Sequence, residues 1–220
     1  RLNQWVKEFV RWMPMEKWDA FAFPVSEDDL EGRVCYGGLD LSSTTDITAF
    51  VLVLPPLDED DKYVLLPYFW VPEDTLDLRV RCDHVPYEVW ERQGFLMTTE
   101  GNVVHYGYIE KFIEQLGERF NIREIAFDRW GAIQMVQNLE GMGFTVVPFG
   151  QGFKDMSPPT KELMKLVLEK KIAHGGHPVL RWMMDNIYIR TDPAGNIKAD
   201  KEKSTEKIDG AIATIMGLDR

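Results

Sequence analysis

The sequence predicts an α/β domain built on a mixed central β-sheet that is flanked by helices. Three observations point to this class. Three strand-like runs come first, helices and strands then alternate, and a helix with an apolar face ends the chain. With 220 residues, 45% of them hydrophobic, the chain can form one large domain and bury a core.

The N-terminal segment is expected to be a linker. Residues 1–32 are predicted to be a helical stub that follows a preceding domain, and residues 33–220 the domain itself. Leu2–Phe21 is apolar and interrupted by proline, which predicts two short helices. Its tryptophans are expected to be exposed: Trp5, Trp12 and Trp18. Because the first residue is Arg1 rather than Met, we expect the chain to begin inside a longer protein.

Three strands are predicted to form an antiparallel meander. They are Arg33–Leu39, Ile47–Leu54 and Lys62–Trp70, and the segments between them are rich in Ser, Thr, Asp and Pro. The helical period of Tyr106–Phe120 then predicts a crossover helix, after which Glu124–Phe127 can pair in parallel with the first strand.

The remaining elements follow from local patterns. Residues 73–95 are expected to be helical in pieces, broken at Pro86. A strand pair should turn at Asp192–Asn196. Further elements are a helix at Ala132–Met142, a strand at Phe144–Pro148, a helix at Thr160–Lys170 and a final helix from about Thr205.

Composition constrains the function. The formal charge of −11 opposes general nucleic-acid binding. Its distribution is uneven, because residues 151–220 hold 12 Lys and Arg against 10 Asp and Glu, whereas residues 1–150 hold 13 against 26. This pattern fits a site that holds metal ions and meets DNA along one face. Cys35 and Cys82 fit neither a disulfide framework nor a zinc cluster, which favours a reducing cytosol.

Three acidic residues stand where an acid normally lowers stability. Asp40 ends the first predicted strand, Asp128 ends the strand after the crossover, and Asp209 lies beside the apolar stripe of the final helix. Three carboxylates gathered at one edge of the sheet would repel one another unless they held a divalent cation. Oxygen ligands alone favour Mg²⁺ or Mn²⁺ over Zn²⁺.

Each acid also has a simpler interpretation when it is taken alone. Asp40 precedes Leu41 and three hydroxyl residues, so it could form a turn. Asp128 could make a surface ion pair with Arg129, and Asp209 could complement a helix dipole. The order of the three acids is what favours the metal site.

The residues around the three acids resemble a known family. They are Gly38-Leu39-Asp40-Leu41-Ser42-Ser43-Thr44-Thr45-Asp46, Ala126-Phe127-Asp128-Arg129-Trp130 and Lys207-Ile208-Asp209-Gly210-Ala211. They are similar to the three nuclease motifs of tailed-bacteriophage terminase large subunits, with the closer match to the HK97-like branch. The likeness spans roughly Arg33 to the C-terminus.

The resemblance implies an RNase H-like fold and two-metal phosphodiester hydrolysis on double-stranded DNA during viral genome packaging. Two divalent ions, Mg²⁺ or Mn²⁺, would lie roughly 3.5–4 Å apart. Asp40 would bridge them, and Asp128 and Asp209 would each hold one side. Asp46 is a fourth candidate ligand, although it could simply be a hairpin residue.

Substrate and partners follow from the same resemblance. Lys198, Lys201 and Lys203 precede the helix that carries Asp209, so they are candidates to contact DNA phosphates; a solvated face is the alternative. The expected partners are double-stranded DNA, a preceding ATPase domain, the portal and the small terminase subunit, with no membrane. The expected place is the host bacterial cytoplasm.

Two rival interpretations stay open from the sequence. One is another RNase H-like enzyme, a resolvase or transposase or an actin-like ATPase. The other is a docking module for the motor or DNA that does not cut in isolation, which exposed tryptophans would support.

Overall fold

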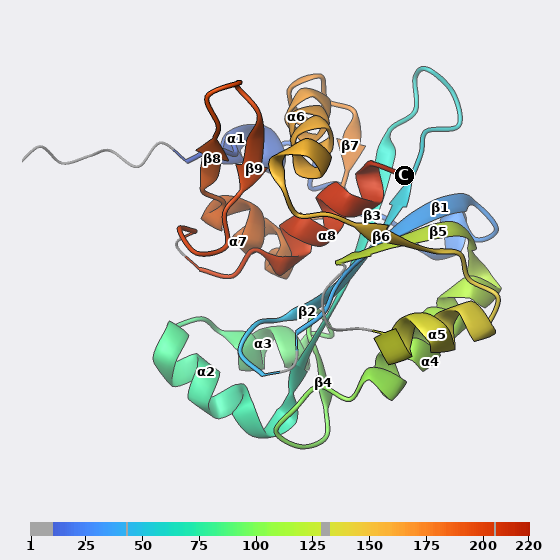
Figure 1. Ribbon diagram of the computed structural model, residues 1–220, viewed down its shortest axis with the longest axis vertical. Coiled ribbons are helices and arrows are strands. Elements are labelled where there is room, and N and C mark those ends of the chain that lie inside the picture. Colours follow the sequence, from blue (N-terminus) through green and yellow to red (C-terminus); the bar gives the residue numbers. More distant parts are fainter. Residues whose placement is uncertain (1–10, 43, 129–132, 205) are drawn as a thin grey trace, which may run out of the picture.

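The computed structural model describes residues 11–42, 44–128, 133–204 and 206–220. A mixed sheet with strand order β4-β3-β2-β1-β5-β6, and with β7 paired to β3, crosses the molecule (Figure 1). Its strands are β1 (Val34–Asp40), β2 (Thr48–Leu54), β3 (Tyr63–Pro72), β4 (Met97–Thr99), β5 (Asn121–Asp128), β6 (Val146–Phe149) and β7 (Ile172–Ala173). A separate antiparallel pair consists of β8 (Ile189–Thr191) and β9 (Ile197–Ala199).

Helices cover both faces of the sheet, with α4 and α5 on one side and α6 and α8 on the other (Figure 1). The helices are α1 (Met15–Asp19), α2 (Leu76–Asp83), α3 (Tyr87–Arg92), α4 (Tyr106–Arg119), α5 (Ile133–Gly141), α6 (Phe153–Leu168), α7 (Pro178–Asn186) and α8 (Asp209–Leu218), with short 3-10 turns η1 (Asp28–Leu30) and η2 (Glu73–Thr75). The described residues form two hydrophobic cores, one on each side of the sheet.

The predicted pairing of the strands is confirmed. β1, β2 and β3 are antiparallel neighbours. β5 lies parallel beside β1, because α4 carries the chain back to the edge at which β1 began. The parallel register sets Leu39 opposite Phe127, so β1 and β5 end side by side.

Helix α8 packs directly against β1. Every residue of α8 from Asp209 to Gly217 is buried. The two backbones come so close at Gly38 that a β-carbon there would lie 1.8 Å from the carbonyl oxygen of Ala213. Glycine at position 38 therefore permits this contact between the sheet and the helix.

Several expectations differ from the structure. Strands β4 and β7 were not expected, and α6 begins at Phe153 rather than near Thr160, with Pro158 and Pro159 inside it. The final helix begins at Asp209 rather than near Thr205, and residues 200–204 before it form a hydrogen-bonded turn.

The tryptophans near the N-terminus also differ from expectation. Trp18 is 1% exposed and stacks on His174, and Trp12 is half-buried against the same core, so neither is an exposed aromatic side chain. Trp5 lies outside the described residues.

Within the described part of the chain, no helix is both long and apolar enough to cross a membrane.

Candidate nuclease site

Asp40 and Asp209 meet at the end of β1. Asp40 is the last residue of the strand and Asp209 the first of α8, and each is 2% exposed. One lysine joins them: the ammonium of Lys201 donates to Asp40 Oδ2 at 2.6 Å and to Asp209 Oδ1 at 3.0 Å. The second oxygen of Asp209 accepts a hydrogen bond from the backbone N–H of Ile47 at 3.3 Å.

Asp128 lies at the end of the neighbouring strand. Because Leu39 pairs with Phe127, Asp128 and Asp40 come at the same end of adjacent parallel strands, as predicted. The Oδ1 atom of Asp128 is buried and has no hydrogen-bond partner within the described residues. A buried carboxylate oxygen without a partner is unfavourable and is the kind of atom that a cation would satisfy.

The electrostatics of the site reflect burial and crowding. Burial raises the pKa of Asp40 above its ordinary value, Lys201 acts against this, and the charges of Asp209 and Asp128 add to it. Burial also raises the pKa of Asp209, again opposed by Lys201. Burial alone would lower the pKa of Lys201, but the two carboxylates outweigh it and raise that pKa. The carboxylates therefore require positive charge.

Asp46 stands at the rim of this cluster. Its Oδ1 pairs with the ammonium of Lys207 at 2.8 Å, and its negative charge contributes to raising the pKa of Asp209. A cavity of about 210 Å³ opens between these groups, and Asp46, Lys201, Lys207 and Asp209 are among its lining residues. Asp46 is thus close to the site but, unlike Asp40, it is nearly half exposed.

Arg79 is a residue of this region that the sequence analysis missed. It projects from α2, is 7% exposed, and donates to the backbone carbonyls of Thr44, Thr45 and Asp46 at 2.6, 2.9 and 3.3 Å. It thereby holds the loop between β1 and β2 beside the carboxylates. Nothing in the local pattern of α2 marks this arginine, because its partners lie more than thirty positions earlier in the chain.

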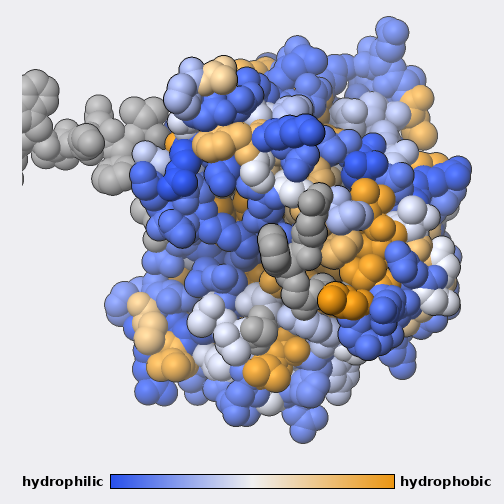
Figure 2. Space-filling view, in the orientation of Figure 1, coloured by the Kyte–Doolittle hydropathy of each residue, from blue (hydrophilic) through white to orange (hydrophobic). Residues whose placement is uncertain are grey.

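The predicted DNA-contacting lysines occupy different surroundings. Lys201 is bonded within the carboxylate cluster. The ammonium of Lys198 lies 5.2 Å from the centre of the Phe153 ring, and that of Lys203 lies 5.8 Å from the centre of the Tyr188 ring. The face shown in Figure 2 is mostly hydrophilic, with hydrophobic residues gathered over β6 and α5.

The donor set fits a divalent ion in its chemistry. All candidate ligands are carboxylates, and an ammonium already stands between two of them as a cation would. Within the described residues, no three His, Cys, Asp or Glu side chains are grouped closely enough to hold one ion as they stand. The carboxylates of Asp40, Asp128 and Asp209 would have to close around an ion while Lys201 withdraws.

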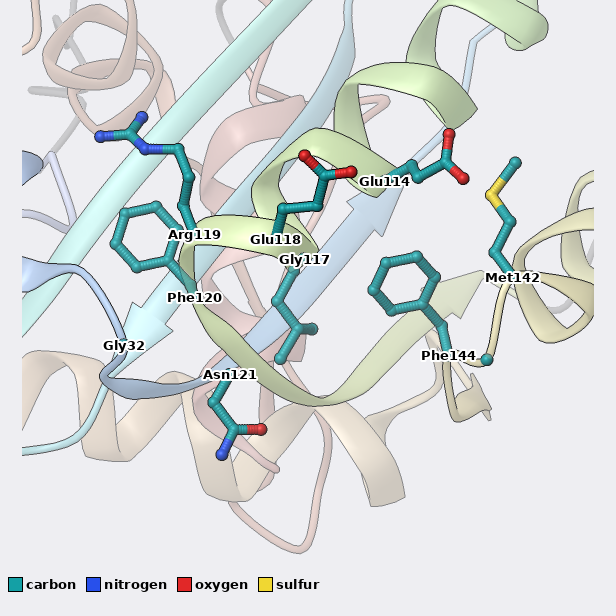
Figure 3. Close-up of a pocket in the computed structure, with 11 residues that line it drawn as sticks. Gly32, Glu114, Gly117, Glu118, Arg119, Phe120, Asn121, Met142 and Phe144 are labelled. Carbon is teal, nitrogen blue, oxygen red and sulfur yellow. The ribbon is translucent and has the colours of Figure 1, made fainter.

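A larger cavity, of about 630 Å³, lies elsewhere (Figure 3). Asn121, the first residue of β5, is part of its wall, whereas Asp128 is the last residue of that strand. Eight residues of extended strand place the two sites roughly 20 Å or more apart. This cavity is therefore separate from the carboxylate cluster.

Comparison with known proteins identifies relatives. The sequence model of the family "Terminase large subunit, endonuclease domain" matches residues 1–220. The large terminase subunit of Enterobacteria phage HK97 is 40% identical over 188 residues, which are 84% of this chain and 37% of that protein. The crystal structure of the HK97 large terminase matches at a TM-score of 0.85 and 36% identity, covering 94% of this chain and 43% of that one.

More distant structures share the fold. The large terminase nuclease of thermophilic phage G20c with bound magnesium matches at a TM-score of 0.55 and 12% identity, over 86% of this chain and 84% of that chain. The nuclease domain of the large terminase of bacteriophage SPP1 with bound manganese matches at a TM-score of 0.53 and 16% identity, over 90% of this chain and 92% of that chain. Terminase nuclease domains have the RNase H-like fold, which is therefore the fold of this chain. The chain belongs to the family of terminase large-subunit endonuclease domains.

Proposed function

We propose that this domain is a divalent-metal-dependent endonuclease that cuts concatemeric double-stranded viral DNA during genome packaging. The observation that carries the proposal is the cluster at the ends of β1 and β5. There, two buried carboxylates share one ammonium, and a third, Asp128, has a buried oxygen that has no hydrogen-bond partner among the described residues. Buried negative charges so close together destabilise the fold unless a cation neutralises them. Such clusters are typical of functional sites.

Asp40, Asp128 and Asp209 would hold the ions, and Asp46 is a fourth candidate. Two divalent ions, Mg²⁺ or Mn²⁺, would activate a water and stabilise the leaving oxygen in an in-line displacement. Asp40 comes between Asp209 and the adjacent strand end that carries Asp128, which supports a bridging role for it. Magnesium and manganese in the G20c and SPP1 relatives support the choice of ion.

We propose that the DNA approaches across the segment that leads into α8. This segment contains Lys198, Lys201 and Lys203. Lys207 follows it and, like Lys201, lines the cavity of about 210 Å³ beside the carboxylates. Contacts from lysine to phosphate would position the duplex without reading its sequence. The acidic remainder of the chain would repel DNA, which confines binding to this segment.

The wider assembly is also a proposal, since the chain spans 37% of the length of its HK97 relative. Residues 1–32 would connect to a packaging ATPase domain, and the portal and the small terminase subunit would be further partners in the host bacterial cytoplasm. Within the described part of that segment, Met13 and Trp18 are buried in the same core as α6, α7 and α8. The connector would therefore end by packing on the nuclease.

Neutralising the three acids one at a time tests the proposed function. Asp40→Asn, Asp128→Asn and Asp209→Asn each remove a charged ligand with little change in volume, so each should reduce plasmid cleavage with Mn²⁺ by at least about a hundredfold. Asp46→Asn should have a smaller effect. The matched control is Asp29→Asn in η1, an exposed acid at the opposite end of β1. Near-normal cutting by any of the first three variants removes that residue from the site.

A further inference from the structure

Lys201 is the group that neutralises the buried carboxylates in this structure. Its ammonium makes both of its ion pairs inside the cluster, although its side chain is 35% exposed. Asp40 and Asp209 lie at the ends of elements from opposite parts of the chain, 161 and 8 positions from Lys201. A single ammonium therefore joins β1 to α8 at the site.

The turn that carries Lys201 is held by its own hydrogen bonds. The carboxylate of Asp200 accepts from the backbone N–H groups of Glu202 and Lys203 at 3.0 and 3.3 Å. Its carbonyl accepts from the Ser204 hydroxyl at 2.6 Å, and Arg190 pairs with its other carboxylate oxygen at 2.9 Å. Asp200 is 6% exposed, so this turn is a packed feature and presents Lys201 in a defined position.

An ammonium and a divalent ion cannot share this position. An ammonium that donates at 2.6 and 3.0 Å fills the space between the two carboxylates that an ion bound to both would need. The two cations would also repel each other strongly in a buried site. Lys207 differs, because its ammonium pairs with Asp46 at the rim and forms no ion pair with Asp40 or Asp209 among the described residues.

We propose that Lys201 is an internal counter-ion, which stabilises the metal-free site by bridging Asp40 and Asp209 and is displaced when a divalent cation binds. The identity of this cation site rests on the proposed function. Two consequences follow. The wild-type protein binds metal more weakly than its carboxylates alone would allow, and the metal-free fold depends on this lysine.

Metal binding without DNA tests this. In calorimetric titrations with MnCl₂ alone, Lys201→Met should bind Mn²⁺ about tenfold more tightly than wild type or better, because no ammonium has to leave. Lys201→Ala should do the same, which separates the loss of charge from blockage by the new side chain. Lys201→Arg should stay close to wild type. Lys203→Met, on the same turn but over Tyr188, is the matched control and should not change the affinity.

Metal-free stability is the second readout. Without metal, Lys201→Met should melt about 5–10 °C below wild type, because two buried carboxylates lose their partner. Asp40→Asn combined with Lys201→Met should recover most of this loss, because removing the charge of Asp40 also removes its repulsion of Asp209. If Lys201→Met does not fold without metal, folding of the double variant supports the proposal, and failure of both overturns it.

The outcomes separate this proposal from the proposed function. Equal Mn²⁺ affinity in wild type and Lys201→Met, or no binding by either, overturns the counter-ion role, whatever the plasmid assay gives. Tighter binding by Lys201→Met supports it even if wild type fails to cut plasmid DNA, a result that would count against the nuclease function alone.

Discussion

The Arg79 guanidinium holds the loop between β1 and β2, whose described residues belong to no helix or strand. Its three carbonyl partners belong to consecutive residues, Thr44 to Asp46, and its Nε donates to the hydroxyl of Thr75 at 3.0 Å. A planar group with several fixed donors can satisfy such an array, whereas one ammonium cannot reach all of these acceptors. Arg79 therefore acts on the site through the loop, as a positioning residue for Asp46 and Ile47.

We predict that Arg79→Lys lowers the free energy of unfolding by about 1–3 kcal/mol, because buried carbonyls lose their donors. Cleavage should require more Mn²⁺ in this variant, since Asp46 and the N–H donor to Asp209 are less well placed. Urea unfolding and a metal titration of plasmid cleavage measure the two effects. Arg81→Lys, an exposed neighbour on α2, is the control. An unchanged metal requirement in Arg79→Lys would reject the positioning role.

Individual residues also show where sequence reasoning stopped. Asp40 and Asp128 could be predicted to meet, because each follows an apolar run and parallel strands end at one edge. The hydrogen bond from Lys201 to Asp40 could not be predicted, because the sequence of a charged run does not show whether a given lysine faces solvent or turns inward. The contacts of Arg79 could not be predicted either, because they depend on how α2 packs against a loop that is distant in sequence.

At the scale of elements, the packing of α8 on β1 decides where Asp209 lies. Gly37 and Gly38 face different neighbours: a β-carbon at Gly37 would meet the ring of Phe50, whereas one at Gly38 would meet the backbone of Ala213. Relief of the clash at Gly38 requires the helix backbone to shift as a whole. The position of Asp209 relative to Asp40 thus depends on the absence of a side chain at Gly38.

We predict that Gly38→Ala destabilises the domain by about 3 kcal/mol or more, because overpacking against a backbone cannot be relieved locally. Cleavage should fall further than the fraction of folded protein, since α8 carries Asp209 away from β1. Gly107→Ala is the matched control. Beyond the adjacent helix backbone, no described atom lies within 4 Å of the position that its β-carbon would take, and this change within α4 should stabilise the domain by up to about 1 kcal/mol. Thermal unfolding compares the two. A Gly38→Ala variant with wild-type stability would show that α8 can shift without destabilising the domain.

Long periodic elements were predictable from sequence, and short or irregular ones were not. The strands of the meander and helix α4 show apolar patterns over seven or more residues. Strands β4 and β7 have three and two residues, too few to show a period. A helix was expected at Thr160–Lys170, but α6 begins at Phe153 and continues through Pro158 and Pro159. The Thr160 hydroxyl donates to the Met156 carbonyl within it.

For the whole molecule, we expect the charge distribution to govern the proposed binding of DNA. A chain with a net charge of −11 should bind duplex weakly, and with a strong dependence on salt, through the segment that precedes α8. Lys198 and Lys203 can be tested there without disturbing Lys201, because neither forms an ion pair with the carboxylates within the described residues.

We predict that Lys198→Ala combined with Lys203→Ala weakens binding to all duplex sequences alike. The slope of log affinity against log salt should fall by up to about one unit for each lost phosphate contact. Fluorescence anisotropy with a labelled duplex in Ca²⁺, across a salt series, measures this without turnover. Lys161→Ala combined with Lys165→Ala, on the exposed side of α6, is the control. A salt slope equal to that of wild type would leave Lys198 and Lys203 as a solvated face.

The burial of α8 also determines when the site can exist during synthesis. Strands β1 and β2 leave the ribosome long before α8, yet α8 fills the apolar face of both. The Lys201–Asp40 contact spans 161 positions, so it cannot form until nearly all of these residues have been made. A nascent chain therefore carries Asp40 and Asp128 without Asp209, and a ribosome-bound or truncated product lacks both a complete core and a complete set of acids. Under the proposed function, the chain could therefore cut DNA only once its fold is complete.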